Sequence, residues 1–171
     1  MGSAFELKIL RLHWLENTEE QIDLCAHGEV FLRIGDEIVS DEQKGNWTLS
    51  STALYLLRSL DRNYRPGYYG QLLPCCGFSF LLGRDGEVVI SSCPNGIDWT
   101  IEHFDKKVCH TSEKGTKAII GFDDYKLQVL NFVDEVETFY NRSEPKEIPT
   151  EEMEGYNAFW KEWKELRIKY N

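Results

Sequence analysis

The sequence has no long apolar run. No stretch of its 171 residues approaches the roughly 18 to 20 consecutive apolar residues that a membrane-spanning helix needs. The first ten residues, MGSAFELKIL, also lack the basic region, apolar run and cleavage site of a secretory signal. We therefore expect a cytoplasmic protein that has no membrane partner.

Local signatures of phosphate binding and of catalysis are missing as well. The chain contains neither G-x-x-x-x-G-K-S/T nor G-x-G-x-x-G, and neither a G-x-S-x-G elbow nor an H-E-x-x-H pair. Many active sites have no local signature, so these absences do not exclude an enzyme, but they favour a binding protein. A small thiol-dependent enzyme and a regulatory ligand-binding domain are the alternatives.

The cysteines do not form a disulfide framework. There are five, an odd number, scattered at positions 25, 75, 76, 93 and 109, as is typical of reduced thiols in a cytosol. A zinc site could in principle combine some of them with His103 or His110, but structural zinc usually uses cysteines two to four residues apart. We therefore predict no metal and no cofactor, and expect small packing cysteines.

The organising stretch of the chain is Ile22 to Val39. Its alternation predicts one long strand with a buried apolar face, followed by a tight turn at Gly35-Asp36. The apolar set is Ile22, Leu24, Ala26, Val30, Leu32 and Ile34, and the polar positions between them include Asp23, Cys25, His27 and Glu29. We expect the polar row to face solvent. A Cys25–His27 nucleophile and base is the alternative, although neighbours at i and i+2 lie about 6.6 Å apart on a strand.

The remaining pattern predicts further hairpins and helices. The apolar phase shifts near Ile9-Leu10, which indicates a β-bulge. Hairpins are expected over Gly77 to Cys93 and around Glu113 to Gly115, and helices over Ser50 to Arg62, from Asp123 or Asp124 to about Tyr140, and from Pro149-Thr150 onward. The inward stripe of the last helix should be Met153, Tyr156, Phe159 or Trp160, Trp163 and Leu166.

These elements predict one α+β domain spanning residues 1–171. The chain is 42% hydrophobic and of a length that fills a single core. Runs of hairpins without alternating strand and helix units favour a mainly antiparallel sheet built from successive hairpins and covered by two or three helices. The opposite face of such a sheet is then open to solvent or to a partner.

Charge is the compositional feature that points toward a function. The net charge is −10, and the segments 15–45 and 134–171 contribute −7 and −4 of it. A negative surface repels nucleic acid and attracts basic proteins. We therefore predict a basic protein partner that is bound by Glu16, Glu19, Glu20, Asp23 and Glu29. The alternative is that the acidity only keeps the protein soluble.

A second candidate for partner binding is the segment Tyr64 to Gly70, which is rich in tyrosine and glycine. Tyrosine offers a large contact area with a polar tip, so Tyr64, Tyr68 and Tyr69 could extend the binding surface. The alternative is that these rings pack over the edge of the core.

The general profile, a small acidic α+β domain without a catalytic signature, resembles that of many bacterial immunity proteins. Such proteins block a toxin through surfaces of opposite charge. This resemblance implies a toxin as the basic partner, and it assigns no role to any single residue.

Overall fold

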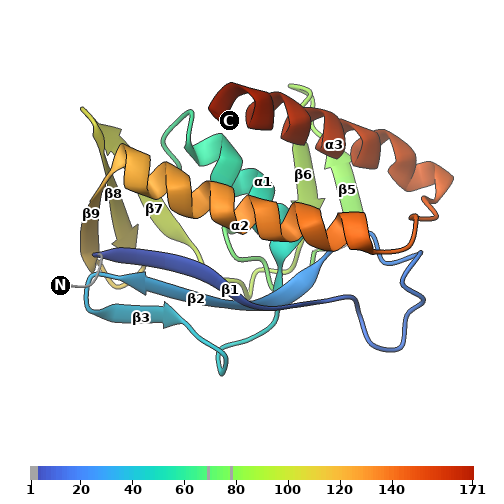
Figure 1. Cartoon of the computed structure of the whole chain (residues 1–171), viewed down its shortest axis with the longest axis horizontal. Coiled ribbons are helices and arrows are strands. Elements are labelled where there is room, and N and C mark those ends of the chain that lie inside the picture. The colour runs from blue at the N-terminus through green and yellow to red at the C-terminus, as the bar shows by residue number, and fades with distance from the viewer. Residues whose placement is uncertain (1–3, 69, 78) are drawn as a thin grey trace.

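Three helices and three antiparallel sheets make up the described chain. The computed structural model describes residues 4–171 except 69 and 78, and over these residues it confirms an α+β fold (Figure 1). The elements, in chain order, are β1 Phe5–His13, β2 His27–Ile34, β3 Glu37–Ser40, β4 Trp47–Thr48, α1 Leu49–Ser59, β5 Ser79–Leu82, β6 Val88–Ser91, β7 Trp99–Phe104, β8 Lys107–Ser112, β9 Lys117–Gly121, α2 Phe122–Arg142 and α3 Thr150–Tyr170. The predicted hairpins are present, but their strands divide among separate sheets.

The first sheet is built on β2, which pairs with β1, β3 and β4. Val30, Leu32 and Ile34 are fully buried, as the alternation predicts. Gly35 closes the turn to β3 with a φ of 62°, which glycine adopts without a Cβ clash. The register of β1 against β2 shifts between Ile9 and Arg11, so the predicted bulge is confirmed.

The central strand is shorter than predicted, because β2 begins only at His27. The backbone groups just before β2 form hydrogen bonds with side chains and not with a neighbouring strand. The Tyr140 hydroxyl donates to the carbonyl of Leu24 at 2.5 Å, and Ser50 Oγ accepts from the amide of Ala26 at 2.7 Å. Residues 23–26 are therefore packed against α1 and α2, and the polar side chains of this stretch turn inward. Ile22, which the alternation places on the buried face, is instead 49% exposed because the strand has not yet begun.

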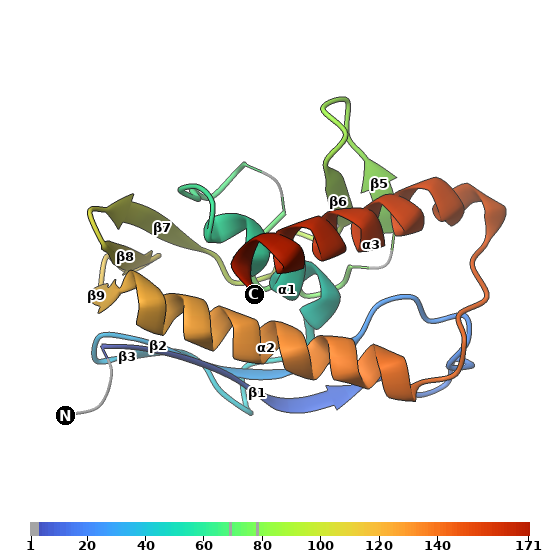
Figure 2. The same ribbon diagram turned by 45° about the horizontal axis from the view of Figure 1, so that its top comes forward.

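Helix α1 lies at the centre of the molecule (Figure 2). All eleven of its residues are buried, including Ser50 and Arg58, and it contacts α2, α3 and β2. It ends at Ser59 and not at the predicted Arg62. The sequence predicts one apolar face, whereas the surrounding elements cover every side.

The β5–β6 hairpin and the β7–β8–β9 sheet complete the strands. Both follow the predicted turns, with Gly86 and Gly115 at φ values of 83° and 88°. Phe78, which the sequence places at the start of the first of these hairpins, lies outside the described residues.

The two long helices cover the core. Helix α2 begins after Gly121, so Asp123 and Asp124 lie in its first turn and are not its N-cap. On α3, Tyr156, Phe159 and Trp163 are buried as predicted, but Met153 is 44% exposed. Helix α3 turns the face with Gly155 toward β5, so Met153 points away from this contact. The approach is so close that a Cβ atom added at Gly155 would lie 2.0 Å from the carbonyl oxygen of Phe80. Within the described residues, no helix has the length and apolar character needed to cross a membrane.

Candidate protein-binding surface

The acidic connector between β1 and β2, residues 14–26, is hydrogen-bonded to the linker between α2 and α3, residues 143–149. The carbonyl of Gln21 accepts from the amide of Glu147 at 2.8 Å, and the Glu20 carboxylate accepts from the amide of Glu144 at 2.9 Å. Lys146 Nζ donates to the carbonyl of Glu20 at 2.5 Å. Both segments lie at the right-hand end of the molecule in Figures 1 and 2.

Trp14 anchors this junction, and its ring stacks on Phe139 with centroids 4.7 Å apart. Its indole nitrogen donates to Ser143 Oγ at 2.9 Å, and the ammonium of Lys146 lies 3.2 Å from the centroid of its ring. Burial lowers the pKa of Lys146, and the nearby carboxylate of Asp23 acts in the opposite direction. The connector is therefore held by an aromatic cluster and a cation–π contact.

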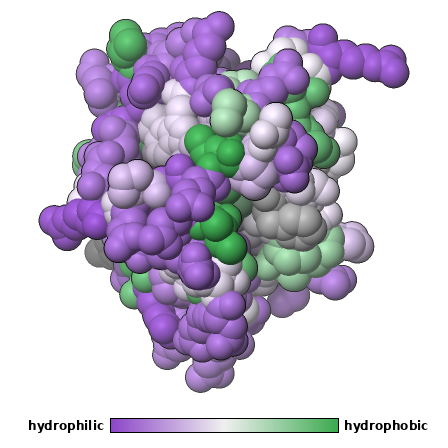
Figure 3. All heavy atoms as spheres, turned by 90° about the vertical axis from the view of Figure 1, so that its right-hand side faces the viewer, coloured by the Kyte–Doolittle hydropathy of each residue, from purple (hydrophilic) through white to green (hydrophobic). Residues whose placement is uncertain are grey.

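The junction joins the two acid-rich parts of the sequence. Glu16 and Glu19 of the connector and Glu144 and Glu147 of the linker are all exposed. The view onto this end of the molecule is mostly hydrophilic, with a small apolar area near its centre (Figure 3). Lys146 offsets part of the negative charge here, but its ammonium is directed onto Trp14 and Glu20.

A hollow of about 490 Å³ opens beside the start of the connector. Three carboxylates line it: Glu16 from the connector, Glu29 from β2 and Glu42 from the loop after β3. Its other lining residues are Arg11, His13, Leu15, Gln43, Gly45 and Asn46. The structure therefore brings together Glu16 and Glu29, two of the residues that the charge pattern selects, and adds Glu42, which that pattern did not select individually.

The hollow also contains two basic side chains, Arg11 and His13, which do not neutralise all three carboxylates. Arg11 lies 3.9 Å from Glu29, at the limit of an ion pair, and both groups are partly exposed to solvent. The ring of His13 is held between the carbonyl of Trp14 at 2.8 Å and Asn46 Oδ1 at 2.9 Å. Neither basic group contacts Glu16 or Glu42 through an ion pair among the residues that the structure describes.

Asp23 does not belong to this surface, which corrects the prediction. It is 7% exposed and accepts hydrogen bonds from the amides of Leu15 and Cys25 and from His27 Nε2, at 2.8, 3.3 and 3.4 Å. Burial acts to raise the pKa of Asp23, but these hydrogen bonds outweigh it and lower the pKa below its usual value. The buried carboxylate of Asp23 therefore holds the connector through hydrogen bonds within it. The half-buried carboxylate of Glu20 holds the connector through its hydrogen bond with the amide of Glu144.

The tyrosine segment is mostly a structural element. Tyr64 is fully buried, and its hydroxyl lies 2.8 Å from Asp98 Oδ2 and 2.9 Å from the carbonyl of Gly70. Tyr68 is 60% exposed and touches the ring of Tyr64 edge-on, and Tyr69 lies outside the described residues. Because Tyr64 pairs with β7, this segment lies away from the connector (Figure 1).

The geometry does not favour the alternative hypothesis of a thiol-dependent enzyme that uses Cys25 or Cys109 with a neighbouring histidine. Cys25 is 1% exposed, and its burial raises its pKa well above the usual value. Cys109 and His110 are neighbours on β8 and point to opposite faces of it. His110 is fully buried, stacks on Phe5 and accepts from the indole of Trp99 at 3.2 Å, and burial lowers its pKa to about 3. A neutral, enclosed imidazole of this kind is a packing group.

The structure does gather three other cysteines. The sulfur atoms of Cys75, Cys76 and Cys93 lie within 4.8 Å of one another, which is close enough for a shared thiophilic metal ion. The Sγ atoms of Cys75 and Cys93 are 3.0 Å apart. The contact with Cys75 lowers the pKa of Cys93 to about 7, and the same contact raises the pKa of Cys75 to about 12. The spacing of these cysteines did not indicate the group, but Cys76 and Cys93 flank the predicted hairpin, which was the available signal.

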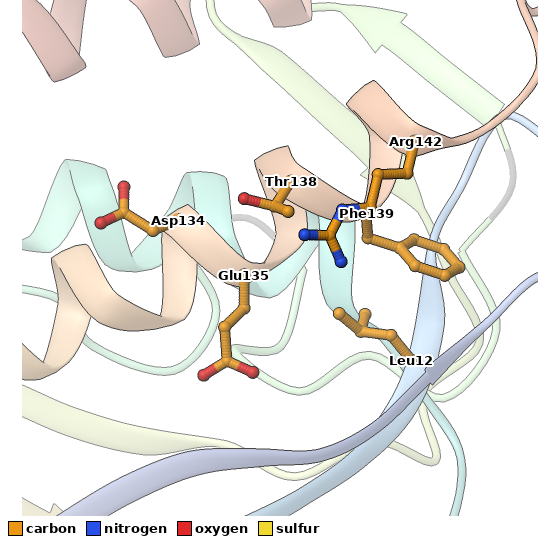
Figure 4. Close-up of a pocket in the computed structure, with 6 residues that line it drawn as sticks. All are labelled: Leu12, Asp134, Glu135, Thr138, Phe139 and Arg142. Atoms are coloured by element: carbon orange, nitrogen blue, oxygen red, sulfur yellow. The ribbon is translucent and has the colours of Figure 1, made fainter.

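Two further hollows border α2. One, of about 350 Å³, is lined by Leu12, Asp134, Glu135, Thr138, Phe139 and Arg142. In Figure 4 the side chains of Asp134 and Glu135 point in different directions, and Asp134 also pairs with Arg167, so these carboxylates do not converge. The other hollow, of about 480 Å³, lies between α2 and α3 and is lined by aromatic rings such as Trp160 and by Lys146 and Lys164.

The acidic hollow is thus the site that is lined by two residues selected by the sequence, Glu16 and Glu29, together with Glu42. Relatives offer no independent guide to its role. Comparison of the chain with protein-family models, with curated proteins and with solved structures finds no match.

Proposed function

We propose that this protein is a protein-binding module that engages a basic partner through the acidic hollow. The observation that carries the proposal is the convergence of Glu16, Glu29 and Glu42 from three separate segments on one hollow of about 490 Å³. A lysine or arginine side chain is the natural occupant, because its charge would meet three carboxylates. Leu15, 45% exposed at the same hollow, offers an apolar contact for the methylene groups of that side chain.

The surrounding charge supports a role in recognition. Exposed carboxylates of the connector and the linker extend the negative field beyond the hollow. Such a field accelerates the encounter with a basic protein and selects against acidic partners. In its narrower form the proposal is a cytoplasmic antagonist of a bacterial toxin, and that form rests on the resemblance to immunity proteins.

The test begins by identifying the partner from the site itself. A photo-crosslinking amino acid at position 16 or 42, in the full chain expressed in its native cell, should capture one basic protein. The same amino acid at Glu113 or Glu165, which are exposed elsewhere on the molecule, should not capture it. A gene for a large secreted protein immediately upstream would support the toxin form.

Association rates with the captured protein then test the mechanism. The triple variant Glu16→Lys, Glu29→Lys and Glu42→Lys should bind at least about tenfold more slowly at low salt, because electrostatic steering acts on the association step. The matched control Glu113→Lys, Glu154→Lys and Glu165→Lys makes the same change in net charge at exposed positions outside the hollow. Equal rates for the two triple variants, or rates that do not respond to salt, would rule out the hollow as the binding site.

A further inference from the structure

The three gathered cysteines lie at the open end of the β5–β6 hairpin. Cys75 and Cys76 precede β5, and Cys93 follows β6. The antiparallel register, which pairs Ser79 with Ser91, brings the two flanking segments together. As a result the Sγ atoms of Cys75 and Cys93 lie 3.0 Å apart although 18 positions separate them in sequence.

All three cysteines are half-buried, and one of them borders a surface hollow. Cys93 lines a surface hollow of about 430 Å³, together with Pro66, Gly70, Gln71 and Asp98. Cys75 and Cys76 are not among the residues that line it. The turn that follows Cys93 is held by Gln71, whose amide nitrogen donates to the carbonyls of Pro94 and Gly96 at 3.0 and 3.2 Å. A small molecule in this hollow would therefore meet Cys93, whose Sγ atom lies 3.0 Å from that of Cys75.

We propose that Cys93 and Cys75 form a reversible disulfide by exchange with a low-molecular-weight disulfide of the glutathione class. In the first step the Cys93 thiolate attacks one sulfur of oxidised glutathione, which forms a mixed disulfide and releases one glutathione thiolate. In the second step Cys75 loses its proton and attacks Cys93 Sγ, which breaks the mixed disulfide and releases the second glutathione. Two protein thiols are oxidised, one glutathione disulfide is reduced, and the two thiol protons end on the two glutathione molecules.

The 3.0 Å contact selects Cys75 as the partner of Cys93, although Cys76 Sγ also lies within 4.8 Å of Cys93 Sγ. Attack on Cys93 Sγ requires a second sulfur in contact with it, and Cys75 is in contact at 3.0 Å. The new bond would close the end of the two-stranded β5–β6 sheet, whose strands are otherwise held by their own ladder and by packing against α3. The disulfide would therefore hold β5 against β6 and restrain opening of the hairpin. This site is chemically independent of the acidic hollow, so either proposal can fail without the other.

The experiment follows the thiols of the full-length reduced protein in glutathione buffers of rising oxidised fraction. The reaction is quenched by alkylation, and intact mass and peptide mapping locate the modified cysteines. The wild type should lose two of its five thiols together and yield a Cys75–Cys93 cross-linked peptide. Cys75→Ser should instead accumulate a stable glutathione adduct on Cys93, and Cys93→Ser should form neither product. Cys109→Ser, a half-buried thiol outside the trio, is the matched control and should behave as the wild type.

Three results would overturn the proposal. The first is a glutathione adduct on wild-type Cys93 that persists without cross-linking to Cys75. The second is a wild-type protein whose Cys93 does not react across the whole range of buffers. The third is a reduced protein that retains one zinc or copper ion by elemental analysis and in which all three sulfurs are shielded from alkylation, because the trio would then be a thiolate metal site.

Discussion

Tyr64 and Asp98 form a buried hydrogen-bonded pair, and the carboxyl of this pair has a raised pKa. The tyrosine hydroxyl lies within hydrogen-bond distance of both Asp98 Oδ2 and the carbonyl of Gly70, yet it has one hydrogen to donate. When Asp98 is ionised, it accepts from Tyr64; when it is protonated, it can donate to the tyrosine oxygen, and Tyr64 then donates to Gly70. Burial raises the pKa of Asp98 to about 6, and the hydrogen bond from Tyr64 only partly opposes it.

We expect Asp98→Asn to alter the pH dependence of stability. The folded-state pKa of about 6 lies above the usual 3.8, so the folded protein binds the extra proton and loses stability as pH rises through this interval. The asparagine amide can donate to Tyr64 at every pH. The difference in the free energy of unfolding, variant minus wild type, should therefore increase between pH 4.5 and 7.5 by on the order of 1 to 3 kcal/mol in urea titrations.

The comparison of variant with wild type also removes the effect of His110. Its folded-state pKa of about 3 lies below the usual 6.5, so His110 contributes stability that is lost on acidification, which is the opposite sign. That contribution is the same in both proteins and cancels in their difference. A difference that stays constant with pH would show that Asp98 is ionised over the whole range.

Residue roles in the connector could not be predicted from alternation alone. The pattern from Ile22 to Ile34 separates apolar from polar positions, and it is correct for Val30 and Leu32 on β2. Asp23 and Cys25 are buried because other side chains and amides supply their partners, and a period-2 pattern does not contain that information. Glu16 and Glu29 could be selected from the sequence because their charge is known from the residue type alone. In the structure both line one hollow.

At the scale of elements, one buried ion pair joins α1, α3 and β6. Arg58 is 2% exposed, and its guanidinium donates to both carboxylate oxygens of Glu162, at 2.5 and 2.7 Å. It also donates to the carbonyl of Val88 at 2.5 Å. A buried guanidinium depends on such partners because transfer from water without them is costly.

Removing the carboxylate of Glu162 should therefore strongly reduce the free energy of unfolding. Glu162→Ala removes both carboxylate contacts of the buried Arg58 guanidinium, and we expect a loss of about 3 to 5 kcal/mol in the free energy of unfolding. Glu165→Ala, at an exposed position on the same helix, is the matched control and should change stability by less than about 0.5 kcal/mol. Chemical denaturation of both variants measures the difference. Similar values for the two would mean that the ion pair does not hold α3 in place.

Gly155 makes the contact between α3 and β5 possible. Replacing a helical glycine with alanine normally stabilises a helix by about 1 kcal/mol. Here the added Cβ would lie 2.0 Å from the backbone oxygen of Phe80, so helix and strand must separate. We expect Gly155→Ala to destabilise the protein by about 1 to 3 kcal/mol in thermal or urea unfolding. Asn157→Ala, exposed on the same helix, controls for helix propensity, and a stabilised Gly155→Ala would contradict the close packing.

Most elements could be predicted because their signals are local. The turns at Gly35 and Gly86 and the break after α2 follow from neighbouring residues, whereas α1 ends three residues before the predicted Arg62. The division of the strands into separate sheets could not be predicted, because it depends on which hairpins pack together. The full burial of α1 was missed for the same reason, since its polar residues, such as Ser59, find partners on distant elements such as Tyr125.

At the scale of the whole molecule, the terminal helix is part of the core. Tyr156, Phe159 and Trp163 are buried, and Glu162 supplies the partner of Arg58. A chain that ends at Pro149 should therefore expose the apolar surface of α1 and β5 and lose cooperative unfolding, as seen by calorimetry and by circular dichroism. A soluble truncated chain with a sharp thermal transition would instead make the aromatic stripe of α3 a candidate docking surface.

The contact between Lys146 and Glu20 joins positions 126 apart in sequence, and it fixes the connector that carries Glu16. Contacts of such high sequence separation form late, because a long loop must close first. During synthesis the ribosome therefore releases Glu16 long before Lys146 is available to hold the connector. A nascent chain would therefore hold the connector in this position only after Lys146 has left the ribosome.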